Sequence, residues 1–328
     1  IIKAEKITYF KNKENIIAEG YVEVNDTENN LTLNSNKLSY SKNEEKIIAD
    51  ENVLLNDFKN NVIINSKKII YFKNINKFYS EGNTTAKIQT KYTFEGSDIF
   101  FFKNEMRLQS SKKTQIIDDN NTKYTLGSFN YQINDEFLKA TKIEIIENFN
   151  LSNNTTNKYY FEDGFFDLKQ KNFKTGLAKI HLKKNTFDRP ENDPRLYGVS
   201  SNHKDNITTV EKAVFTSCKK NNDECPPWQL EASEIKHDKI KRQLIYKDTV
   251  LKVYDIPVFY FPKFFHPDPT VNRQSGFLTP KLNNSNILGT SISVPYFGAI
   301  SDNRDFTFNP IFFSKNVKLF QNEFRQEN

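Results

Sequence analysis

The chain has 328 residues, of which 37% are hydrophobic and 14% aromatic, and its formal net charge is +6. No apolar run approaches the roughly 18 residues that a membrane-spanning helix needs, whereas transmembrane β-barrels remain possible because their strands are apolar only at alternate positions. The positive charge is spread along the chain rather than gathered in one block, so we expect no nucleic-acid partner.

A repeat of about 30 residues occupies the first hundred positions. Its four copies, ITYFKN, LSYSKN, IIYFKN and IFFFKN, begin at Ile7, Leu38, Ile69 and Ile99. Each ends in Lys-Asn, which we interpret as a turn because Asn tolerates the left-handed backbone that tight turns require. A second apolar stretch follows the first three copies, as at 18–22. Each unit therefore predicts strand, turn and strand.

One hairpin cannot bury its own apolar face, so successive units must share an interior. The fold class predicted is all-β, built of stacked hairpins. Period alone leaves two interpretations open, a solenoid or sandwich with a sealed core and an open curved jellyroll whose interior admits a lipid. Alternation suggests an inward set, which a register slip of one residue would reverse: Ile7, Tyr9, Val22, Val24, Leu38, Tyr40, Val53, Ile69 and Tyr71.

The only cysteines, Cys218 and Cys225, stand in the run FTSCKKNNDECPPWQL. Two cysteines with scattered histidines give weak support for zinc, so we predict no metal site. In an oxidising compartment a disulfide is the natural interpretation. The two cysteines could bond each other or reach cysteines elsewhere in a longer chain.

The segment 253–269 combines four prolines with six aromatic residues, which predicts an extended edge or connector rather than an inner strand. We weigh a buried structural edge equally with a lipid-contacting one. Further on, Ile292, Val294 and Tyr296 alternate with serines, and Phe306 and Phe308 alternate with polar residues. Lipid on one side and water on the other would produce this pattern, and so would a soluble sandwich with one wet face.

Pro280 and Pro295 stand inside two adjacent predicted strands. Each removes a backbone donor, and an unpaired backbone group is costly in lipid. They would therefore mark a deliberately weak seam between strands. The alternative is that each proline merely ends its strand.

Several runs resemble a known family. They are RQSGFLTP at 273–280, GTSISVPYF at 289–297, DFTFNP at 305–310, DIPVFYFP at 255–262 and the loop at 218–228. All are similar to the lipopolysaccharide-assembly proteins LptD, also called organic solvent tolerance proteins. The repeats at the beginning of the chain resemble the OstA-type domain of that family. The resemblance covers essentially the whole chain.

The resemblance implies a periplasmic OstA-like β-jellyroll over residues 1–265 and the first strands of an outer-membrane β-barrel over residues 266–328. Lipopolysaccharide would arrive from a periplasmic bridge protein of the LptA type by edge-strand addition. Its acyl chains would contact the inward set, and Pro280 and Pro295 would flank a lateral gate to the outer-membrane lipid. A plug lipoprotein of the LptE type would fill the barrel.

Two features depart from the family. Only the first few barrel strands are present, and the family's long-range disulfides use C-terminal cysteines that this chain lacks, which leaves the partners of Cys218 and Cys225 open. The chain also begins at Ile1 without a signal peptide and stops within a predicted strand, so we expect a fragment.

Catalytic motifs are missing from the sequence: it has no recognisable Ser/His/Asp set, paired carboxylates or phosphate loop. We therefore predict a transport protein of the outer membrane that is no enzyme and needs no cofactor. The alternative hypothesis is a structural or adhesive β-repeat protein with a sealed core and no lipid cargo.

Overall fold

The computed structural model describes residues 1–151, 156–187, 192–219, 226–268, 271, 273–278 and 280–327. Its elements are β-strands apart from three short 3-10 helices, η1 (Lys11–Lys13), η2 (Lys73–Ile75) and η3 (Lys184–Phe187). The predicted all-β class is confirmed. The chain divides into two compact units, residues 1–236 with 247–262, and residues 237–246 with 263–328. No helix in the described ranges is long and apolar enough to cross a membrane.

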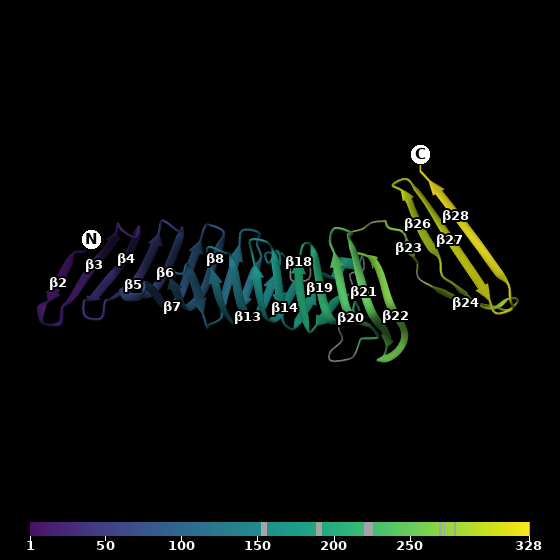
Figure 1. Cartoon of the computed structure of the whole chain (residues 1–328), viewed down its shortest axis with the longest axis horizontal. Helices are drawn as coiled ribbons and strands as arrows, with labels where there is room; N and C mark the ends of the chain where they lie inside the picture. The colour runs from purple at the N-terminus through teal and green to yellow at the C-terminus, as the bar shows by residue number, and fades with distance from the viewer. Residues whose placement is uncertain are drawn as a thin grey trace. The chain divides into compact units, whose positions relative to one another are not determined.

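Six long antiparallel strands follow one another at the start of the first unit (Figure 1). They are β3 (Asn15–Asp26), β4 (Leu31–Ser41), β5 (Lys46–Asp57), β6 (Val62–Phe72), β7 (Lys77–Ile88) and β8 (Tyr92–Phe102). Each pairs with the next along the chain. The short strands β1 (Ile2–Lys3) and β2 (Lys6–Phe10) both pair with β3. The predicted stacking of hairpins is confirmed.

Each long strand bends in its middle, where the pairing register shifts. Left-handed residues stand at these corners, with φ of 79° at Gly20, 61° at Glu51 and 78° at Gly82. The corners recur with the period of the sequence repeat. The bend divides the sheet into half-sheet 1, which contains β2, and half-sheet 2, which contains β1.

Beyond β8 the two halves continue partly as separate strands. β9 (Arg107–Ser110), β12 (Ser128–Gln132), β15 (Asn172–Thr175) and β18 (Ser200–Lys204) lie in half-sheet 1. β10 (Thr114–Asp118), β11 (Lys123–Leu126), β16 (Ala178–His181) and β17 (Arg195–Gly198) lie in half-sheet 2. β13 (Phe137–Ile146), β14 (Lys158–Asp167) and β19 (Ile207–Thr216) pair with strands of both. β20 (Trp228–Asp238), which pairs with β19, is followed by β21 (Gln243–Val253) and β22 (Ile256–Pro267).

The core lies between the two half-sheets, whose inner faces touch. The ring of Phe94 in half-sheet 2 lies 5.5 Å from that of Phe129 and 5.6 Å from that of Tyr131, both in half-sheet 1. One continuous cluster of buried apolar side chains runs from Ala18 to Ala178. The first unit is thus a sheet folded over on itself around an apolar interior.

The Lys-Asn turns lie where the repeat predicts them. The backbone N–H of the fourth turn residue donates to the carbonyl of the first, as from Glu14 to Lys11 and from Asn76 to Lys73. The left-handed residues are Glu14, Glu45, Asn76 and Met106, each two positions after the Asn of the pair. The prediction that this Asn adopts the left-handed conformation is therefore wrong. The Asn lies in the helical middle of the turn, and the residue two positions later is the left-handed one that ends the turn.

The second unit contains a separate antiparallel sheet. Its strands are β23 (Gly276–Phe277), β24 (Lys281–Ser285), β25 (Gly289–Ser293), β26 (Tyr296–Ser301), β27 (Arg304–Phe313) and β28 (Lys318–Gln326). β27 is central, because one part of it pairs with β26, another part with β25, and nearly its whole length with β28.

Candidate functional site

The inward set predicted from alternation lines the interior of the first unit. Val22, Leu38, Val53 and Ile69 are at most 1% exposed. Val24, Tyr40 and Tyr71 are partly buried and pack against the same cluster. Successive strands place these residues side by side because directly paired residues in an antiparallel sheet point to the same face. Leu38 and Ile69, for example, are both paired with Ala49.

Ile7 and Tyr9 share this face but are not buried. They pair with Ala18 and Ile16, which places them on the inner side of half-sheet 1. Their exposed fractions are 52% and 59%, because β2 has β3 as its single partner strand in the part of the chain that the structure describes. These two residues therefore form an accessible end of the apolar surface.

An aromatic row continues the inner face beyond the predicted set. The rings of Tyr71 and Phe78 stack at 4.3 Å, and Phe101 follows 5.9 Å from Phe78. Burial and the nearby Asp26 carboxylate raise the pKa of Tyr71, so its hydroxyl stays neutral and donates to Asn76 Oδ1. Phe78, Phe101 and Tyr131 were missed from sequence, although extending the same alternation into later strands would have found them.

A seam forms where the strand ends of the two half-sheets meet. Lys103 follows β8 in half-sheet 1, and its Nζ lies 3.3 Å from Asp57 Oδ2 and donates to the Asn29 carbonyl at 3.0 Å. Asp57 is the last residue of β5 and Asn29 lies in the turn before β4, both in half-sheet 2. Farther along, Lys91 Nζ lies 2.6 Å from Glu136 Oε2, again across the two half-sheets. We call these two ion pairs the seam pairs.

The first seam pair is the more buried. The side chains of Lys103 and Asp57 are 10% and 1% exposed, against 38% and 19% for Lys91 and Glu136. Removing charges from water is costly unless hydrogen bonds compensate. Asp57 therefore also accepts hydrogen bonds from the backbone and side-chain nitrogens of Asn60.

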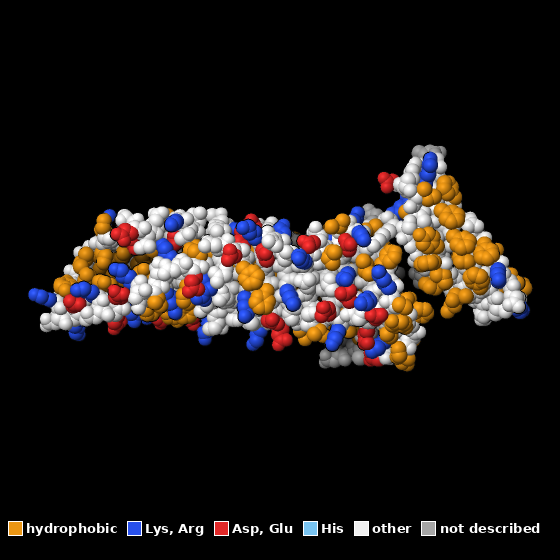
Figure 2. Space-filling view, in the orientation of Figure 1, with side chains coloured by type: hydrophobic (Ala, Val, Ile, Leu, Met, Phe, Trp, Pro, Cys, Tyr) orange, Lys and Arg blue, Asp and Glu red, His pale blue; other side chains and the backbone are white. Residues whose placement is uncertain are grey.

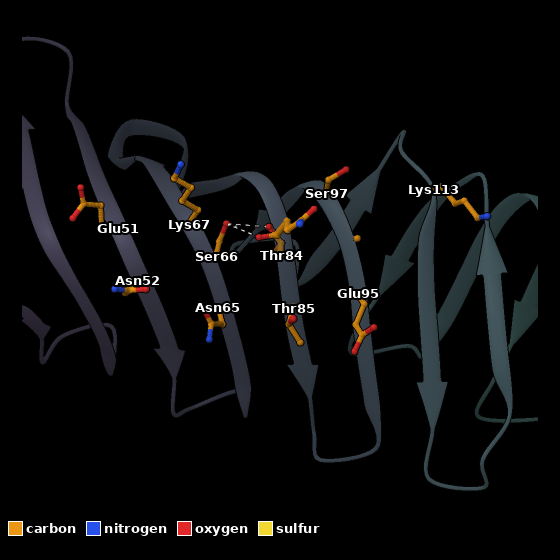
Figure 3. A pocket seen from close by; sticks show the side chains of 12 residues that line it. Glu51, Asn52, Asn65, Ser66, Lys67, Thr84, Thr85, Glu95, Ser97 and Lys113 are labelled. Atoms are coloured by element: carbon orange, nitrogen blue, oxygen red, sulfur yellow. Dashed lines mark hydrogen bonds between the residues drawn. The ribbon is translucent and has the colours of Figure 1, made fainter. Parts of the chain in front are cut away.

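An open pocket of about 970 Å³ lies along the corner between the half-sheets, not in the apolar interior (Figure 3). Its lining is polar and includes Glu51, Asn65, Lys67 and Glu95. Its floor includes Ser66 and Thr84, whose hydroxyls are hydrogen bonded at 3.1 Å. Such a pocket suits polar groups, whereas acyl chains require the apolar interior.

In the second unit the usual burial of polar and apolar residues is reversed. Ser291, Ser293 and Asp305 are at most 6% exposed, whereas Ile292 and Phe312, a directly paired couple, are 46% and 45% exposed. The exposed aromatic face, which also carries Phe320 and Phe324, forms an apolar band (Figure 2). On the polar face Asp305 accepts hydrogen bonds from Arg273 and Arg325.

Several known proteins that are similar to this chain are LPS-assembly proteins LptD, although no family model matches it. LPS-assembly protein LptD of Polaromonas sp. is 33% identical over 123 residues, 37% of this chain and 15% of that protein. LptD of Pseudoalteromonas translucida is 35% identical over 113 residues, and LptD of Albidiferax ferrireducens is 30% identical over 158 residues. The resemblance to the LptD family is confirmed over the matched part, which is 34% to 44% of this chain for these three relatives. The matched part covers 15% and 20% of the lengths of the latter two relatives.

Pro280 and Pro295, which were predicted to stand inside two adjacent strands, lie outside them. Pro280 is exposed and immediately precedes β24, and the buried Pro295 separates β25 from β26. Both prolines therefore lie at strand ends and not inside strands, which corrects their predicted position. Their role at a lateral gate stays a prediction. A proline lacks the N–H that a central ladder needs, although the carbonyl of Pro295 still accepts from Leu278 N at 2.7 Å.

The cysteine pairing that the LptD resemblance raises stays a prediction. Cys218 is half-buried just after β19, and its carbonyl accepts a hydrogen bond from Arg195 at 2.7 Å. Cys225 lies outside the described residues. The residues with described placement contain no group of three or more His, Cys, Asp or Glu able to hold a metal ion.

The proline-aromatic segment is extended, as its composition predicts. Residues Ile256–Pro267 form β22. Val258, Phe259 and Tyr260 are each more than half exposed. The segment therefore offers an apolar surface, and the hypothesis of a buried structural edge is wrong for these three side chains.

Proposed function

We propose that this chain takes part in lipopolysaccharide assembly at the outer membrane, without catalysing a reaction. The first unit would lie in the periplasm and hold the acyl chains of lipopolysaccharide between its half-sheets. The observation that carries this proposal is the continuous apolar interior, lined by the inward set, in a chain that is similar to LPS-assembly proteins.

The interior has the chemistry that acyl chains need. Each methylene group removed from water contributes about 0.8 kcal/mol, and side chains such as Leu38, Ile69 and Phe101 offer an apolar environment along many strands. Because these residues are at most 1% exposed, acyl chains would enter by separating the half-sheets and not by filling a preformed cavity.

The edge strand β2 and the apolar band of the second unit support the partner assignments. β2 could accept a strand of a bridge protein of the LptA type, because an unpaired sheet edge exposes backbone donors and acceptors. The second unit would supply the first strands of the outer-membrane barrel, with its apolar band toward lipid and Asp305 toward water. Pro280 and Pro295 would border the lateral gate, and a lipoprotein of the LptE type would plug the completed barrel.

A second candidate function is supported by the tight packing of the interior. A structural or adhesive β-repeat protein would have the same buried core, from Ala18 to Ala178, but no cargo. The two functions differ in whether the half-sheets ever separate to admit lipid.

Photo-crosslinking distinguishes these functions. A benzophenone amino acid at Tyr71, on the inner face, should capture lipopolysaccharide on irradiation of cells. The matched control is Phe72, the next residue in β6, whose ring packs outside under the amino groups of Lys46 and Lys77. Capture at position 72 but not at 71, or at neither position, would contradict lipid transport through the interior and favour the sealed core.

A further inference from the structure

We propose that the seam is the binding site for the acidic head group of an amphiphile, in which Lys103 and Lys91 exchange their carboxylate partners for the phosphates of the lipid. This inference rests on the proposed function, because it assigns the entry point and the head-group contacts of a lipid whose chains lie inside. The seam pairs are then latches that hold the half-sheets together until the lipid arrives.

Position is the first support. Both seam pairs join residues that are distant in sequence: Lys91 and Glu136 are 45 positions apart, and Lys103 and Asp57 are 46 positions apart. They stand at the rim of the apolar interior, where the half-sheets must separate if an acyl chain of the lipid is to enter from the side. A head group held at this rim stays in water while its chains are buried.

Tyr131, close to the second seam pair, points to a ligand. Its ring lies 6.1 Å from that of Tyr92, and Lys91 Nζ lies 5.1 Å from the Tyr92 ring. Tyr131 is 1% exposed, yet its hydroxyl has no hydrogen-bond partner among the described residues. Leaving a buried hydroxyl unpaired is costly, and an ester or hydroxyl oxygen of a bound lipid would supply the missing partner.

Chemistry favours the exchange of partners. A phosphate offers a lysine more acceptor oxygens and more negative charge than a carboxylate does. A buried ion pair contributes little net stability, although breaking it leaves a buried charge without its partner. When Lys103 turns to a phosphate, Asp57 keeps the two hydrogen bonds from Asn60, which offset part of that cost. The pair of Lys68 and Glu81 at 2.7 Å differs, because it links neighbouring strands β6 and β7 on the outer surface.

The test compares substitutions on the two sides of each seam pair. In the purified full chain, Lys103→Gln and Lys91→Gln should each weaken the binding of fluorescein-labelled lipopolysaccharide about tenfold, because each removes a charged hydrogen bond. Asp57→Asn and Glu136→Gln should tighten binding about threefold, because they free the lysine while an amide oxygen remains as acceptor. Enzymatically dephosphorylated lipopolysaccharide should show neither effect.

Matched controls keep the outcomes distinct. Lys68→Gln and Glu81→Gln change an ion pair away from the seam and should leave affinity unchanged. Circular dichroism verifies folding, and the more exposed Lys91 and Glu136 provide the comparison if the buried variants fail to fold. Equal losses on both sides of a pair, or effects that persist without phosphate, would overturn the proposal while lipid transport stands. A wild-type chain that binds no lipopolysaccharide would overturn both.

Discussion

The corner glycines allow the strain at the bend to be separated from steric contact. Gly20 and Gly82 occupy the same position in two repeats and have nearly the same φ, +79° and +78°. A Cβ at Gly82 would meet nothing within 4 Å, whereas a Cβ at Gly20 would lie 2.3 Å from Glu5 Oε2 and 2.9 Å from Glu5 Cβ. Rotation of the Glu5 side chain relieves the first contact but not the second.

We therefore expect different losses of unfolding free energy in the two variants. Gly82→Ala should cost about 1 kcal/mol, which is the penalty for a side chain in the left-handed region. Gly20→Ala should cost roughly twice that, because the contact with Glu5 adds to the same penalty. Glu51, which occupies the equivalent corner with φ of 61°, provides the reverse test: Glu51→Gly should stabilise the chain by about 0.5 kcal/mol.

Urea unfolding of the purified chain, followed by circular dichroism, measures these changes as shifts in midpoint at constant slope. The double variant Glu5→Gly with Gly20→Ala removes the contact and should return the loss to that of Gly82→Ala. Equal losses for Gly20→Ala and Gly82→Ala would refute the steric contribution. A neutral Gly82→Ala would refute the claim that the bend depends on a left-handed residue.

Two further substitutions test the interior and the Asp26 carboxylate at the end of β3. Leu38→Ala should lower the unfolding free energy by about 2–5 kcal/mol, because Leu38 is 0% exposed and its removal leaves a cavity. Ser39→Ala, at the neighbouring outward position, is the control. Similar urea midpoints for the two variants would show that the interior is not close-packed. The second substitution concerns Asp26. Burial raises the pKa of its carboxyl group, but hydrogen bonds from Asn29 outweigh burial and hold that pKa below its usual value of 3.8. A lowered pKa in the folded state stabilises the chain above pH 3.8, and this contribution is lost as the pH falls below it. In the Asp26→Asn variant, the urea midpoint should therefore fall less steeply than in the wild type as the pH is lowered below 3.8. The same pH dependence in both proteins would contradict a stabilising role for the Asp26 carboxylate.

Much of the architecture could be predicted from local pattern. The repeat beginning at Ile7, Leu38, Ile69 and Ile99 gave the hairpins and the turns, since period-two alternation and turn chemistry act over a few residues. Alternation also identified the interior side chains, but it overestimated the burial of Ile7 and Tyr9. Burial depends on how many strands cover a face, and β2 has one neighbour in the described chain.

By itself, then, the sequence determined the all-β class, the hairpin repeat and the side of each strand that is apolar. Tertiary structure alone decided that the long strands bend at Gly20, Glu51 and Gly82, because the register shift at each corner arises between strands and not within one. It alone decided that Lys103 meets Asp57. That contact joins hairpin ends in different repeats, and only the folding of one half-sheet over the other brings the two charges together.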